Sequence, residues 1–129
     1  MMEIHTSPIY IGILTLMMMV LGARVSFLRN KFKVSLGTGD KPELQRAVRV
    51  FGNMAEWIPM ILIALVVSEM LGAPQWLIHV VGIALIVGRL ATLPGIRPDQ
   101  TNAARAVAAM LTLLSALVTG GYLVYVSVA

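Results

Sequence analysis

The most informative absences in this chain of 129 residues are those of cysteine and of charge. Without cysteine there is no disulfide framework, no thiol nucleophile and no thiolate metal site. Charged residues make up only 12% of the chain, whereas about a quarter of the residues of an ordinary globular protein are charged. The two histidines and the few carboxylates form neither a metal-binding constellation nor a Ser/His/Asp pattern. The composition therefore excludes thiol chemistry by the protein itself and predicts no metal site.

Apolar residues take the place of the missing charge, at 58% of the chain and a mean hydropathy of +0.86. Four apolar runs stand out, at approximately residues 8–28, 53–71, 76–93 and 103–127. With its flanks, each run reaches the ~20 residues that a transmembrane helix needs. The sequence predicts a single-domain, all-α membrane protein folded as a four-transmembrane-helix bundle.

The basic residues predict how this bundle is oriented. All ten lie around the first or the third connection: Arg24, Arg29, Lys31, Lys33, Lys41, Arg46 and Arg49, then Arg89, Arg97 and Arg105. By the positive-inside rule, both connections face the cytoplasm and both termini lie on the non-cytoplasmic side. Topology thus explains the net charge of +4 without a nucleic-acid partner. The basic residues follow the first apolar run, so this run is interpreted as a retained span and not as a signal peptide.

The second helix is predicted to begin in solvent and to end in the membrane. Asp40 is expected to cap its N-terminus, with Glu43 three residues later completing an acidic capping box. Pro42 fits the first turn, where its missing N–H costs no helical hydrogen bond. Pro59 is expected to kink the helix because it leaves the carbonyl of Ala55 without its donor.

Four polar residues of this helix, Arg46, Arg49, Asn53 and Glu56, are spaced by three, four and three residues. Such spacing places them on one stripe that descends into the membrane. Guanidinium groups pair with carboxylates and a carboxylate accepts hydrogen bonds from an ammonium, so the stripe is suited to a zwitterionic ligand. Glu56 is followed by apolar residues only, to residue 67, and a carboxylate at that depth indicates a functional site with Arg49 or Asn53 as partner. The alternative is a structural ion pair between helices.

Two further arginines are expected at the same depth. Arg89 lies near the cytoplasmic end of the third run, and snorkelling to the interface is its alternative interpretation. Arg105 lies early in the fourth helix among alanines, whose small side chains favour close approach of neighbouring helices and oligomerisation. Glu3 and Glu69 are expected to be solvated at the opposite end.

The segment from Gly37 to Pro59, GTGDKPELQRAVRVFGNMAEWIP, closely resembles the second-helix signature of the MAPEG superfamily, membrane-associated proteins in eicosanoid and glutathione metabolism. The pattern R-x-x-x-N-x-x-E-x-x-P is met by Arg49, Asn53, Glu56 and Pro59. The likeness is greatest to short bacterial members. It extends over essentially the whole chain, with the same charge layout and the GRL segment at 88–90.

The resemblance implies a protomer of a homotrimer in a bacterial inner membrane, with active sites between subunits. It also implies a cytoplasm-facing pocket that binds glutathione as co-substrate and acts on lipophilic electrophiles or lipid hydroperoxides. The site residues that it implies are Arg46, Arg49, Asn53, Glu56 and Arg89 for glutathione, with Glu56 on the ammonium, and Arg105 beside the sulfur. Arg24 or Arg29 would add a carboxylate contact. A guanidinium beside the sulfur would favour the thiolate over the thiol.

The chain also departs from the family pattern. Thr92 stands where many members have histidine, Ile96 where tyrosine is common, and Ala106 where some have serine; Gly52 replaces a residue that is basic in some eukaryotic relatives. A non-catalytic lipid-binding protein of the same fold is therefore the alternative function. A small proton-coupled exporter is a third, although the arginines beside Glu56 would repel cationic drugs.

Overall fold

The computed structural model describes residues 3–93 and 102–129, and within these ranges it contains four helices and no strand. They are α1 (Ser7–Phe32), α2 (Pro42–Met70), α3 (Gln75–Ala91) and α4 (Asn102–Val128). In the described residues, α1, α2 and α4 are long and apolar enough to cross a membrane, and α3 is a shorter apolar helix of 17 residues. The predicted all-α, four-helix membrane architecture is confirmed.

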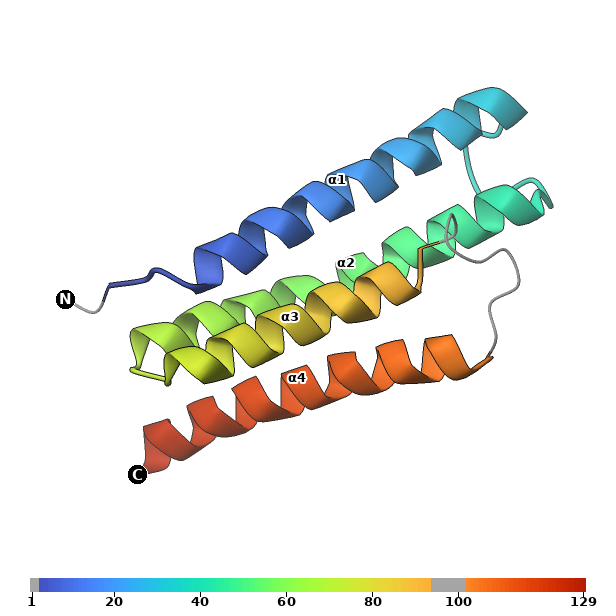
Figure 1. The fold of residues 1–129 in the computed structure, drawn as a ribbon. Coiled ribbons are helices and arrows are strands. Elements are labelled where there is room, and N and C mark those ends of the chain that lie inside the picture. The colour runs from blue at the N-terminus through green and yellow to red at the C-terminus, as the bar shows by residue number, and fades with distance from the viewer. Residues whose placement is uncertain (1–2, 94–101) are drawn as a thin grey trace.

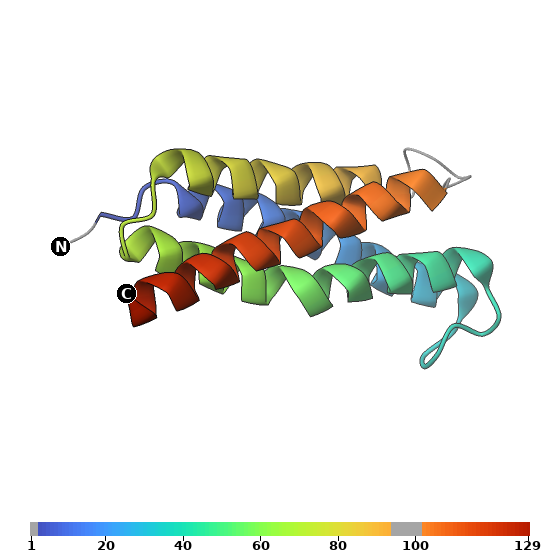
Figure 2. The same ribbon diagram turned by 90° about the horizontal axis from the view of Figure 1, so that it is seen from below.

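The helices run roughly alongside one another in an elongated bundle (Figures 1 and 2). The α2 and α3 helices each pack against both α1 and α4, so they form the middle of the bundle. Both termini and the turn between α2 and α3 lie at one end, and the connection between α1 and α2 lies at the other (Figure 1). The start of α2, the end of α3 and the start of α4 therefore meet at the end opposite the termini.

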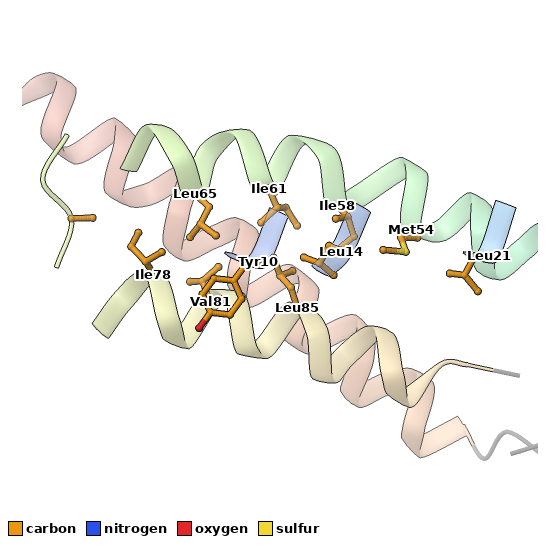
Figure 3. Packing of buried hydrophobic residues seen from close by; sticks show 11 residues of the cluster. Tyr10, Leu14, Leu21, Met54, Ile58, Ile61, Leu65, Ile78, Val81 and Leu85 are labelled. Atoms are coloured by element: carbon orange, nitrogen blue, oxygen red, sulfur yellow. The ribbon is translucent and has the colours of Figure 1, made fainter. Parts of the chain in front are cut away.

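Large aliphatic side chains of α1, α2 and α3 fill the core. The α2 helix supplies them at three- and four-residue spacing, so one face of it is buried throughout. Figure 3 shows these side chains meeting those of α1 and α3 between the helices. The cluster includes Tyr10, Leu14, Leu21, Met54, Ile58, Ile61, Leu65, Ile78, Val81 and Leu85.

The α4 helix packs through small and hydroxyl-bearing residues instead. Its buried positions are Ala108, Thr112, Ser115 and Thr119, and each of the three hydroxyls donates to the carbonyl four residues earlier, at 2.7–2.9 Å. These bonds satisfy the hydroxyls within their own helix, which apolar surroundings require. Gly88 of α3 faces Ala108, and small residues on both sides bring the two helices close together.

A second close approach joins α1 to α3. The ring of Tyr10 lies against Gly82, where a Cβ atom would come within 2.3 Å of the Tyr10 ring. The Tyr10 hydroxyl forms a hydrogen bond with Nδ1 of His79, 2.6 Å away. Because His79 and Gly82 are three residues apart on α3, one aromatic side chain is held by both.

The N-cap predicted for α2 is wrong. Gly39 and Asp40 both have positive φ, and the chain enters the helix one residue later, with Lys41 as N-cap. The Lys41 carbonyl accepts the Gln45 N–H at 2.9 Å. Glu43 lies 3.7 Å from Lys31 of α1, so the acidic capping box is not formed. The helix begins at Pro42, as expected, and continues through Pro59, where the kink stays a prediction.

The α1 helix is capped by a side chain from α2. No side chain of its own caps it, yet Oε1 of Glu69 accepts the N–H groups of Thr6 at 2.8 Å and His5 at 3.2 Å. Oε2 accepts the N–H of Ser7 at 2.8 Å and its hydroxyl. The expectation that Glu69 is solvated is therefore wrong: it is only 4% exposed, and it satisfies N–H groups that a helix N-terminus leaves unpaired.

Candidate functional site

A pocket of about 640 Å³ opens between α2, α3 and α4, towards the end of the bundle opposite the termini. Four arginines and four uncharged polar residues contribute to its wall, and the rest is apolar. The polar residues are Gln45, Arg46, Arg49, Asn53, Arg89, Thr92, Arg105 and Thr112; the apolar ones are Val50, Trp57, Ala108, Ala109 and Leu113. Five of the six predicted site residues thus surround one cavity.

Arg89 is the buried arginine of this wall, and side chains from two other helices hold it in place. It is 4% exposed, and its guanidinium donates from Nη1 to Oδ1 of Asn53 and from Nη2 to Oγ1 of Thr112, each at 2.5 Å. Thr112 accepts this bond while donating its own proton to the Ala108 carbonyl at 2.9 Å. Arg89 therefore joins α2, α3 and α4 and does not snorkel to the surface. The close approach of Gly88 to Ala108 makes this reach possible.

The remaining Nε of Arg89 is a buried nitrogen for which the described residues supply no acceptor. A guanidinium is satisfied when all of its N–H groups have acceptors, and a buried unpaired donor costs about 1–3 kcal/mol. The nitrogen belongs to a residue of the pocket wall. It is therefore an unfilled donor at the base of the site.

The other three arginines of the pocket wall are exposed, unlike Arg89. Arg46 and Arg49 come from the first turns of α2, and Arg105 comes from the first turn of α4. No acidic residue belongs to the wall as described over residues 3–93 and 102–129. Several guanidinium groups around one cavity create a strongly positive potential, which favours a ligand with more than one negative charge.

Glu56 lies beside the pocket and not in its wall. Its Oε1 is 3.9 Å from Nη1 of Arg49, and the two side chains are 58% and 74% exposed. Three residues advance a helix by about 300°, so Glu56 is turned about 60° from Asn53. Trp57, four residues after Asn53, is turned the other way and occupies the wall instead. The predicted stripe therefore does not line the pocket as a whole, because the exposed Glu56 lies outside the wall.

The other residues singled out from sequence are not in the wall, apart from Thr92. Its hydroxyl donates to the Arg89 carbonyl at 2.9 Å, at the end of α3. Ile96 lies outside the described residues. Arg24, Arg29, Gly52 and Ala106 do not line the pocket, and Arg29 instead donates to the Gly37 carbonyl at 2.7 Å.

The wall residues that the sequence prediction missed include Thr112, Trp57 and Gln45. Thr112 follows Arg105 by seven residues, or two helical turns, so both lie on the same face of α4. Gln45 precedes Arg49 by four residues, and Trp57 follows Asn53 by four. Helical spacing contained a signal for all three, but only the packing shows which side of the stripe faces the cavity.

Comparison with known proteins agrees with this architecture. The model of the MAPEG family matches residues 7–125, from the start of α1 almost to the end of α4. Two curated relatives from strains of Escherichia coli, both called inner membrane protein YecN, are 38% identical over 84 residues, which is 65% of this chain. The match spans 64% of each relative's length. No solved structure matches the chain at a significant level. Because the family model covers all four helices, this chain is an integral membrane protein that belongs to the MAPEG family.

Proposed function

We propose that the protein is a glutathione-dependent transferase or peroxidase of the bacterial inner membrane, acting on lipophilic electrophiles or lipid hydroperoxides. The observation that carries this proposal is the convergence of Arg46, Arg49, Asn53, Arg89 and Arg105, from three helices, on one pocket. The relatives' description as inner membrane proteins supports the location.

The chemistry of the wall fits glutathione, which carries two carboxylates, one ammonium and one thiol. Guanidinium groups bind carboxylates through paired, charge-assisted hydrogen bonds, and the pocket volume of about 640 Å³ lies within the range typical of small-molecule sites. Arg46 and Arg49, which line the pocket, would hold the carboxylates, and the buried Nε of Arg89 would offer a further donor.

Bound glutathione would supply the thiol that attacks the electrophile. Arg105, at the α4 side of the pocket, would hold that sulfur as thiolate, because a positive charge nearby favours the charged form. Trp57, Ala109 and Leu113 form the apolar part of the wall and would receive the hydrophobic reactant. Trp57 and Leu113 are also exposed on the outside of the bundle, where such a reactant arrives from the bilayer.

Glu56 supports a homotrimer with the site between subunits. An ionised carboxylate as exposed as that of Glu56, within an apolar helix, would cost free energy if it faced lipid. A neighbouring subunit packed over the Glu56 side of α2 would remove that cost. It would also place a carboxylate beside the pocket, where the ammonium of the ligand needs an acceptor.

One observation favours the alternative, a non-catalytic lipid-binding protein. The Thr92 hydroxyl donates to the Arg89 carbonyl at the end of α3, and Ala106, next to Arg105 in the sequence, has no hydroxyl group. Arg105 would then act on the thiol without help from either position.

Calorimetric titration of glutathione into the detergent-purified protein tests the binding step. We expect saturable binding that is lost in Arg49→Ala and retained in Lys31→Ala, since Lys31 is a cation of the same end of the bundle that lies outside the pocket wall. Absence of binding to a folded oligomer would exclude glutathione as the ligand and favour the lipid-binding function.

Conjugation of a chlorinated dinitrobenzene tests the chemical step. Arg105→Ala should lower the conjugation rate by at least about 100-fold, as expected when a group that stabilises the developing anion is removed, with oligomeric state unchanged. The ultraviolet absorbance of the bound thiolate should fall with it. Unchanged rates in this variant would refute the role of Arg105 while leaving the binding result standing.

A further inference from the structure

A second hollow, separate from the pocket, lies where α1 meets the connection to α2. Its volume is about 450 Å³, and its wall consists of Ser26, Arg29, Asn30, Lys33, Val34 and Ser35. The first four are spaced by three, one and three residues, which places them on one face at the end of α1. Two cations and three uncharged polar side chains thus face the same space.

Arg29 is held in place over this hollow. Its Nη1 donates to the Gly37 carbonyl at 2.7 Å, which ties the end of the helix to the connection. Lys33 adopts the left-handed conformation that ends α1, with φ of 56°. No acidic side chain belongs to the wall of the hollow within the described residues. Glu43, near the start of α2, pairs with Lys31 at 3.7 Å.

Apolar side chains flank these cations. Leu36, in the connection, is 88% exposed, and Phe27 is exposed on the last turns of α1. The hollow lies at the end of a helix long and apolar enough to cross the membrane, which is the level of the lipid phosphates. Exposed apolar groups beside cations at that level match a lipid, whose acyl chains and phosphate are covalently joined.

We propose that this hollow binds the phosphate of an anionic phospholipid, with Arg29 and Lys33 on the phosphate oxygens. Ser26, Asn30 and Ser35 supply hydrogen bonds to the remaining oxygens and to the polar headgroup. Leu36 and Phe27 insert beside the acyl chains. This inference does not depend on the proposed function, because the hollow shares no residue with the pocket.

Native mass spectrometry of the detergent-purified protein with added lipid tests the proposal. We expect phosphatidylglycerol to be retained in preference to phosphatidylcholine with the same acyl chains. The double variant Arg29→Gln/Lys33→Gln should bind phosphatidylglycerol at least about tenfold more weakly, since it removes both charge-assisted donors to the phosphate.

A matched control removes the same charge from the same connection. Lys31 and Lys41 lie outside the hollow, with their Nζ atoms 5.2 and 5.7 Å from the Phe32 ring. Lys31→Gln/Lys41→Gln should leave phosphatidylglycerol binding within about twofold of the wild type, since neither lysine is placed to donate a charge-assisted hydrogen bond to a phosphate in the hollow. Equal weakening in both double variants would show diffuse attraction to negative charge and would overturn the proposal.

Two further outcomes also decide the matter. If inorganic phosphate or glycerol phosphate displaces the lipid at equal concentration, the site takes free phosphate and the lipid assignment is wrong. If Arg29→Gln/Lys33→Gln dissociates the oligomer, the hollow is a subunit contact and not a lipid site. Should that variant fail to fold, equal retention of phosphatidylglycerol and phosphatidylcholine by the wild type would refute the proposal.

Discussion

Replacement of Glu69 by Gln should destabilise the protein at the N-terminus of α1. The carboxylate receives four donors: the N–H groups of His5, Thr6 and Ser7, and the Ser7 hydroxyl. An amide keeps one oxygen and turns the other into a donor. In the better orientation the NH₂ group replaces Oε2, the Ser7 hydroxyl rotates to accept from it, and the Ser7 N–H is left without an acceptor.

The size of the effect follows from burial. Ser7 is fully buried and Thr6 nearly so, so water is a poor substitute for the lost oxygen. An orphaned buried N–H costs about 1–3 kcal/mol, and the loss of the negative charge at a helix N-terminus adds about 0.3–1 kcal/mol. We expect Glu69→Gln to lower the free energy of unfolding by about 1–4 kcal/mol.

Titration of the protein in mixed micelles with sodium dodecyl sulfate, followed by tryptophan fluorescence, measures this change. Glu3→Gln is the matched control, because Glu3 is an exposed carboxylate at the same end that pairs with the exposed His5. Hydrogen exchange should accelerate at the Ser7 amide in Glu69→Gln alone. A loss of stability no larger than that of Glu3→Gln, or unchanged exchange at the Ser7 amide, would refute the tertiary cap.

Two other substitutions test close contacts of the bundle. Gly82→Ala places a methyl group against the Tyr10 ring and should separate Tyr10 from His79, at a cost of about 1–3 kcal/mol measured in the same titration; an unchanged midpoint would contradict the packing. Arg89→Lys keeps the positive charge but loses the planar guanidinium that donates to both Asn53 and Thr112. Because Asn53 is then no longer held in position, this variant should bind glutathione at least about tenfold more weakly, with its helical circular dichroism signal retained. Wild-type affinity in this variant would show that Asn53 is positioned without Arg89.

The sequence predicted the helices well and their ends less well. Hydropathy identifies the four helices because a backbone in lipid must satisfy its hydrogen bonds internally. The N-cap of α2 was predicted at Asp40, but it is Lys41, one residue later. Gly39 and Asp40 both have positive φ, which delays the start of the helix, and no local sequence pattern predicts this conformation. Glu69 was misjudged for another reason: its partners are more than 60 residues away in the sequence.

By itself, the sequence determined the membrane class, the four-helix architecture and a polar face of α2 at the basic end. Composition and helical spacing are enough for these, because both act within single helices. Only the tertiary structure decided that Arg89 bridges Asn53 and Thr112, that Glu56 lies outside the pocket wall, and that Glu69 caps α1. These depend on how each helix is rotated against its neighbours. That rotation is set by the packing of small residues, such as Gly88 on Ala108, whose contacts no single helix contains.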